Sequence, residues 1–207
     1  DQKTWGYHHS SKLLATSVVF ILAMGLWTNY FNELADLPNN MQEAFEMIMR
    51  NPLGIISVVI MAPIVEELLF RGAIQGHLLR KWKHPAGAIV LSSLIFGVVH
   101  GNWVQAPFAF VTGLALGWMY YRTGSLLPGI LMHFVNNSAA VASFLLADDP
   151  NATMVSTYGQ TGAALMAAGG MALTIICVLF IQKKLVPQPA VWHQPAQAET
   201  IEIENKK

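Results

Sequence analysis

Two adjacent glutamates, Glu66 and Glu67, interrupt an apolar stretch that is long enough to cross a membrane. The stretch runs from Leu53 to about Leu79, and Arg71 stands four residues after the second glutamate. A carboxylate at bilayer depth costs about 2.5–3.5 kcal/mol on insertion scales. Two such groups in one span indicate that this helix faces other helices or a hydrated cavity, where the carboxylates can take part in chemistry.

The rest of the chain agrees with a membrane protein. Only 12% of its residues are charged and 54% are hydrophobic. In soluble domains about a quarter of all residues are charged. Because several apolar runs approach the ~20 residues that a spanning helix needs, we predict an all-α, polytopic helical bundle. The pattern predicts about six transmembrane helices, or up to eight if half-helices are hidden among them. The six runs cover residues 13–31, 53–79, 86–100, 104–121, 126–146 and 163–181.

The charged residues outside these runs divide between the two ends of the predicted bundle. By the positive-inside rule, this division predicts a multi-pass protein with both termini in the cytoplasm. A formal net charge of zero provides no field that would recruit nucleic acid. The basic set is Lys3, Lys12, Arg80, Lys81, Lys83, Arg122, Lys183 and Lys184. The acidic set is Glu33, Asp36, Glu43, Glu46, Asp148 and Asp149, with Arg50 as its one base.

The remaining segments suggest one domain and a tail. We predict a transmembrane domain over residues 1–185 and a disordered tail over 186–207, which carries prolines and polar residues. Residues 39–49 have the spacing of a short amphipathic helix, which either simply connects the first two spans or lies in the outer interface and gates a lateral opening. Gly113 and Gly117 form a small-residue face suited to close helix packing.

Helical spacing separates the two glutamates. Residues four apart share a helix face, so Glu67 and Arg71 can form an ion pair. Neighbouring residues point about 100° apart, so Glu66 has no partner on its own helix and is the better candidate for a carboxylate that faces a cavity. The alternative is a buried carboxylate pair that only holds helices together.

Two further spans carry polar pairs with the same spacing. Phe96 can pack beside the imidazole of His100, and His133 lies four residues before Asn137. Taken alone, His100 could be an interfacial residue, and the second pair could be an interhelical hydrogen bond. Together with Glu66, these groups could deprotonate water and donate to a developing oxyanion. That combination is suited to peptide hydrolysis.

The same residues leave a metal site open as an alternative. Glu66, His100 and His133 could bind a divalent metal such as zinc and leave a position for water. The H-E-x-x-H spacing of soluble zinc proteases is absent. We therefore assign no cofactor from the sequence.

These three motifs resemble the CAAX protease and bacteriocin-processing (CPBP) family of intramembrane proteases. The family is also called Abi and includes the type II CAAX prenyl endopeptidase. Its signature reads E-E-x-x-x-R, F-x-x-x-H and H-x-x-x-N, and all three parts occur here in order within residues 52–145. The resemblance implies an endopeptidase with a glutamate-dependent mechanism, or a metalloprotease. The implied roles are water activation by Glu66 with His100, oxyanion stabilisation by His133 and Asn137, and support from Glu67, Arg71 and Phe96.

The resemblance also implies the partners. We expect a peptide or protein substrate, lipidated or membrane-associated, together with membrane lipids. Two other functions fit the same residues. One is a non-proteolytic bacteriocin-immunity or peptide-binding membrane protein that captures a hydrophobic peptide in the same cavity. The other is a small proton-coupled transporter, although no internal repeat is evident.

Overall fold

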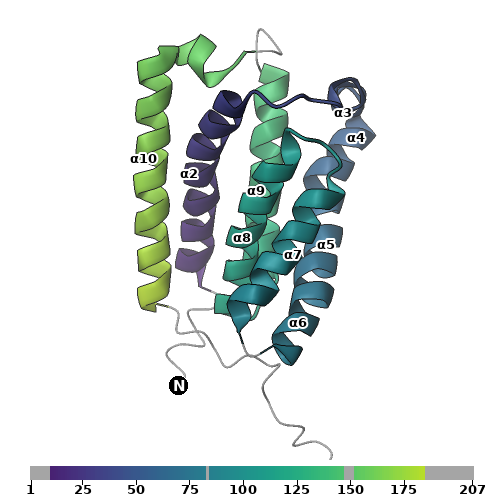
Figure 1. Cartoon of the computed structure of the whole chain (residues 1–207), viewed down its shortest axis with the longest axis vertical. Helices are drawn as coiled ribbons and strands as arrows, with labels where there is room; N and C mark the ends of the chain where they lie inside the picture. Colours follow the sequence, from purple (N-terminus) through teal and green to yellow (C-terminus); the bar gives the residue numbers. More distant parts are fainter. Residues whose placement is uncertain (1–9, 83, 147–151, 185–207) are drawn as a thin grey trace, which may run out of the picture.

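The computed structural model describes residues 10–82, 84–146 and 152–184, and the elements within these ranges are helices. The predicted all-α bundle is therefore confirmed, while the predicted tail over 186–207 lies outside the described residues. The helices run alternately up and down the bundle (Figure 1). They are α2 (Ser11–Ala35), α3 (Gln42–Met49), α4 (Pro52–Ile56), η1 (Ser57–Met61), α5 (Ala62–Glu66), η2 (Glu67–Gln75), α6 (Gly76–Lys81), α7 (Pro85–Val99), α8 (Gln105–Thr123), α9 (Leu127–Leu146) and α10 (Met154–Lys184).

Four helical stretches are long and apolar enough to cross a membrane, judged by length and composition. They are Ser11–Ala35, Pro52–Lys81, Leu127–Leu146 and Met154–Lys184. The helix α7 is apolar but only 15 residues long. Large apolar side chains such as Leu69, Leu165 and Ile176 are exposed, as expected for a surface that faces lipid. The membrane character is supported, and six crossings stay a prediction.

The stretch from Pro52 to Lys81 is one continuous rod in which two segments, η1 and η2, are π-helical. Each segment contains a carbonyl that accepts a hydrogen bond from another helix. Asn137 Nδ2 donates to Val58 O at 2.9 Å, and Ser92 Oγ donates to Phe70 O at 2.8 Å. Glu66 ends the α-helical segment α5, and Glu67 begins the π-helical segment η2. π-helical turns are frequent at functional sites.

The small-residue face of α8 packs as the sequence suggests. A Cβ added to Gly113 would lie 3.0 Å from Ser93 Cβ, and one added to Gly117 would lie 2.6 Å from Gln75 Oε1. The absence of side chains lets buried polar groups reach the α8 backbone. Arg71 Nη2 donates to Gly113 O at 3.2 Å, and Gln75 Nε2 donates to Gly117 O at 2.8 Å.

The other side of the bundle is an apolar core shared by α2, α8, α9 and α10.

At the start of α10, the Glu33 carboxylate accepts hydrogen bonds from the backbone N–H groups of Met154 and Val155, at 3.0 and 3.2 Å. These are N–H groups that a helix start leaves unpaired. The helix α10 then bends at Gly159, whose φ of 71° suits glycine. The residues of the apolar core shared by α2, α8, α9 and α10 are Leu13, Phe20, Ile21, Met24, Ala115, Leu116, Met119, Met132, Cys177 and Ile181.

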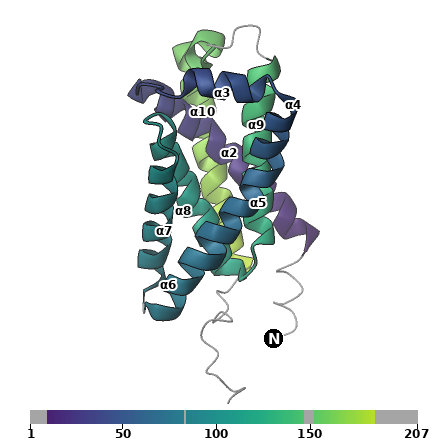
Figure 2. The ribbon, with the colours of Figure 1, turned by 90° about the vertical axis from the view of Figure 1, so that its right-hand side faces the viewer.

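The short helix predicted at 39–49 is present as α3, and it lies across one end of the bundle (Figure 2). We call this the acidic end, because Glu33, Asp36, Glu43 and Glu46 gather there. The opposite, basic end holds the start of α2 and the ends of α6, α8 and α10. Its described charges are Lys12, Arg80, Lys81, Arg122, Lys183 and Lys184.

Candidate active site

A cavity of about 330 Å³ lies among α2, α3, η1, α5, α7, α8 and α9. It has both apolar and polar walls. The lining residues are Asn29, Asn32, Phe45, Met49, Val58, Ala62, Glu66, Phe96, His100, Gln105, Phe108, Ala109, Thr112, His133, Asn136, Asn137 and Ala140.

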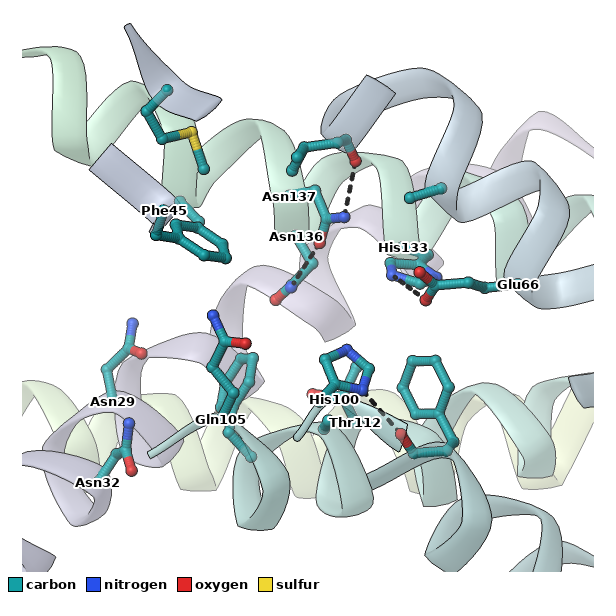
Figure 3. Close-up of a pocket in the computed structure, with 17 residues that line it drawn as sticks. Asn29, Asn32, Phe45, Glu66, His100, Gln105, Thr112, His133, Asn136 and Asn137 are labelled. Atoms are coloured by element: carbon teal, nitrogen blue, oxygen red, sulfur yellow. Dashed lines mark hydrogen bonds and ion pairs between the residues drawn. The ribbon is translucent and has the colours of Figure 1, made fainter. Parts of the chain in front are cut away.

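The structure brings the four side chains singled out as Glu66, His100, His133 and Asn137 to this one cavity (Figure 3). Glu66 ends α5, and His100 follows directly after α7. His133 and Asn137 come from consecutive turns of α9. Three separate stretches of helix therefore converge on one cavity, as the motifs suggest.

Glu66 and His133 lie side by side in the lining of the cavity. Glu66 Oε2 lies 3.7 Å from His133 Nε2, and the side chain of Glu66 is 30% exposed while that of His133 is 5% exposed. The distance is too long for a hydrogen bond, and Oε2 has no hydrogen-bond partner among the described residues. Glu66 thus has no partner on its own helix, as its spacing suggests, and its nearest imidazole belongs to α9.

Glu67 occupies a different, fully enclosed position. Its Oε1 accepts a hydrogen bond from Arg71 Nη1 at 2.9 Å, and both side chains are 1% exposed. The predicted ion pair is present. The same oxygen lies 3.1 Å from His133 Nδ1. Because an ionised carboxylate only accepts, Nδ1 of His133 carries a proton and donates it to Glu67.

This donor assignment fixes the other ring nitrogen of His133. In the neutral imidazole, Nε2 is an acceptor, and it then faces a second acceptor, the Glu66 carboxylate. The Glu66 carboxylate and Nε2 of His133 therefore face each other without a direct hydrogen bond.

Phe96 is the common neighbour of the charged and imidazole groups. Its ring centre lies 4.8 Å from that of His100 and 5.8 Å from that of His133, both edge-on. The guanidinium carbon of Arg71 lies 4.4 Å from the same ring centre. Phe70 contacts Phe96 edge-on from the neighbouring helix, at 5.0 Å. The predicted packing of Phe96 against His100 is present and extends to three further side chains.

His100 has one nitrogen committed and one available. Its Nδ1 lies 2.7 Å from the carbonyl oxygen of Phe96. A carbonyl only accepts, so Nδ1 carries the proton, and Nε2 of the neutral ring is an acceptor. His100 can therefore take a proton at Nε2, which is the ability that a general base requires.

Asn137 is partly engaged. One N–H of its side chain donates to Val58 O, at 2.9 Å, and its Oδ1 accepts from Asn136 Nδ2 at 3.2 Å. An amide nitrogen has two donors, so a second N–H of Asn137 has no assigned acceptor. Asn137 thus braces the π-helical turn η1 and can still donate once.

Four lining residues with amide side chains lie outside the assigned site residues and were missed by the sequence reasoning: Asn29, Asn32, Gln105 and Asn136. Asn29 and Asn32 are three residues apart and share one face of α2. The available signal was their position in or beside apolar spans, which is unusual for amides. That signal is weak because amides are also common near helix ends.

The zinc alternative does not fit the arrangement. Within residues 10–82, 84–146 and 152–184, no three His, Cys, Asp or Glu side chains are grouped so that they could hold a metal ion. A catalytic zinc site needs three protein ligands. We therefore derive no step through a metal.

The chain is similar to a family of membrane peptidases and to two of their relatives. The Type II CAAX prenyl endopeptidase Rce1-like family matches residues 49–139. "Putative membrane peptidase YdiL" of Bacillus subtilis (strain 168) is 32% identical over 102 residues, 49% of this chain and 41% of that protein. "Membrane-embedded CAAX protease MroQ" of Staphylococcus aureus (strain USA300) is 30% identical over 112 residues, 52% of this chain and 45% of that protein.

The matches extend over less than half the length of either relative. No solved structure matches the chain. The matched segment of this chain, residues 49–139, contains all three motifs, from Glu66 to Asn137.

Proposed function

We propose that the chain is an intramembrane endopeptidase, on the premise that residues 49–139 match the Type II CAAX prenyl endopeptidase Rce1-like family. The observation that carries the proposal is the meeting of Glu66, His100 and His133 in one cavity inside an apolar helical bundle. A carboxylate and two imidazoles in a partly dry site are the groups that peptide hydrolysis needs.

In the proposed reaction, the Glu66 carboxylate takes a proton from a water molecule in the cavity. The water oxygen attacks the carbonyl carbon of the peptide bond, and the carbonyl oxygen becomes an oxyanion. The C–N bond then breaks, and the proton on Glu66 passes to the leaving amine. His100 assists by accepting a hydrogen bond from the same water at Nε2.

His133 and Asn137 are proposed to stabilise the oxyanion. Glu67 receives the Nδ1 proton of His133 and thereby orients the ring, as a carboxylate does in other triads. For this role His133 takes a second proton from solvent at Nε2 before the peptide binds and keeps it through the reaction. The imidazolium then lies between two carboxylates and donates a hydrogen bond to the oxyanion. The free N–H of Asn137 supplies a second donor. Glu67 and Arg71 act as positioning residues.

The test is Glu66→Gln, which keeps the shape of the side chain and removes the base. The protein is placed in liposomes and assayed with two internally quenched peptides, one farnesylated and one unmodified. We expect hydrolysis by the unaltered chain and a loss of at least 100-fold in Glu66→Gln, because general base catalysis contributes about 10²–10⁴-fold. Glu43→Gln on the exposed face of α3 is the matched control and should retain activity.

Full activity of a correctly folded Glu66→Gln protein would refute the mechanism. A protein that binds the peptides but hydrolyses neither would instead favour the peptide-binding alternative. Thermal unfolding and gel filtration in detergent separate both results from misfolding.

A further inference from the structure

We infer that the substrate reaches Glu66 from the acidic end of the bundle, and that this end faces away from the cytoplasm. The substrate class is then a peptide segment that has crossed the membrane. The inference rests on the proposed function for the hydrolysis itself, but the direction of access is argued from the cavity and the charges alone.

The cavity is closed toward the basic end. Below Glu66 on the same rod, Arg71 and Gln75 have 0% exposure, and Leu79 has 3%. Arg71 and Gln75 are held by hydrogen bonds to the backbone of α8. On α8 the lining reaches Thr112, in the half that begins at Gln105. A peptide entering from the basic end would have to displace this buried layer.

The cavity continues toward the acidic end. Asn29 and Asn32 line it near the C-terminal end of α2, and Figure 3 shows them at the side away from Glu66. The same two asparagines also line a second hollow of about 900 Å³, together with Glu33 and Asp36. The two hollows therefore share these asparagines as lining residues, and we infer that they mark a path from the acidic end to Glu66.

The path has the chemistry of a peptide-binding groove. The side-chain amides of Asn29, Asn32 and Gln105 line this path and make no hydrogen bond to another residue within the described ranges. An amide both donates and accepts, as the N–H and C=O groups of an extended peptide do. Acidic residues at the entrance favour basic flanking residues in the peptide.

The charge division places this entrance on the far side of the membrane. Among the described loop and end residues, the bases gather at the basic end and Arg50 is the one base at the acidic end. Lysine and arginine are enriched in cytoplasmic loops. The acidic end, with α3 across it, therefore faces outward.

The first test labels single cysteines with a membrane-impermeant maleimide in intact spheroplasts of a bacterial expression host. The sole cysteine, buried Cys177, is first replaced by alanine. We expect labelling of Glu43→Cys and of the cavity position Ala140→Cys to be at least tenfold faster than that of Lys81→Cys, which should react only after permeabilisation. All three positions are exposed. Labelling of Lys81→Cys from outside, or of Ala140→Cys from inside only, would overturn the inference.

The second test adds an unlipidated, internally quenched peptide with basic flanks to the same spheroplasts. We expect hydrolysis without permeabilisation, and none with Glu66→Gln. Hydrolysis only after permeabilisation would overturn the inference and leave the proposed function standing. If no peptide is hydrolysed in either condition while the labelling is as expected, the proposed function fails and the direction of access stands.

Discussion

The buried pair of Glu67 and Arg71 permits a quantitative test of how the site is supported. Arg71 donates to Glu67 Oε1 and to Gly113 O, and its guanidinium lies over the ring of Phe96. Removing one partner of a buried ion pair costs about 3–5 kcal/mol, because the other charge is left uncompensated. In Arg71→Met, His133 still donates to Glu67, so we expect a loss near the lower limit, about 3 kcal/mol.

The double variant Glu67→Gln/Arg71→Met removes the orphaned charge. We expect it to lose less free energy of unfolding than the sum of the single variants, by about 2 kcal/mol, since directly contacting groups couple by about 0.5–3 kcal/mol. The measurement is reversible unfolding by dodecyl sulfate in mixed micelles, followed by circular dichroism. Lys183→Met, an exposed residue at the end of α10, is the control and should be neutral. A loss below about 1 kcal/mol in Arg71→Met, or strict additivity, would contradict the reasoning.

Two further variants test the packing that holds the site. Gly117→Ala places a methyl group 2.6 Å from Gln75 Oε1, so unfolding should become easier by about 1–3 kcal/mol; Gly25→Ala on α2, with nothing within 4 Å, should be neutral or stabilising by up to about 1 kcal/mol. Asn137→Ala leaves the carbonyl of Val58 without its side-chain donor, which should cost about 1–3 kcal/mol and lower peptide hydrolysis at least tenfold. Unchanged activity and stability in Asn137→Ala would count against both of its assigned contacts.

Much of the fold could be predicted from the sequence because membrane constraints act locally. Apolar runs and their breakers gave the helices within a few residues, for example residues 53–79 against Pro52–Lys81. The spacing of four residues gave the ion pair of Glu67 and Arg71. The longest error was in α10, which begins at Met154 rather than at residue 163, because its bend at Gly159 separates a less apolar first turn from the rest.

The features that depend on contacts between helices could not be predicted. The π-helical segments accept hydrogen bonds from Asn137 and Ser92 on other helices, and no local pattern encodes those partners. For the same reason the sequence did not show that the imidazole nearest to Glu66 is that of His133. The amides at Asn29, Asn32 and Gln105 became visible only when the helices enclosed a cavity.

The ring of Phe96 has a mechanical consequence for the whole centre. One benzene ring separates two imidazoles and a guanidinium, and a neighbouring aromatic side chain holds it in place. A ligand that pushes His100 aside would also shift the Phe96 ring. A shift of that ring would disturb its contacts with His133 and Arg71. His100 and Arg71 are thus linked through their shared contact with Phe96. A ligand that displaces His100 would change the packing of the buried Arg71 as well.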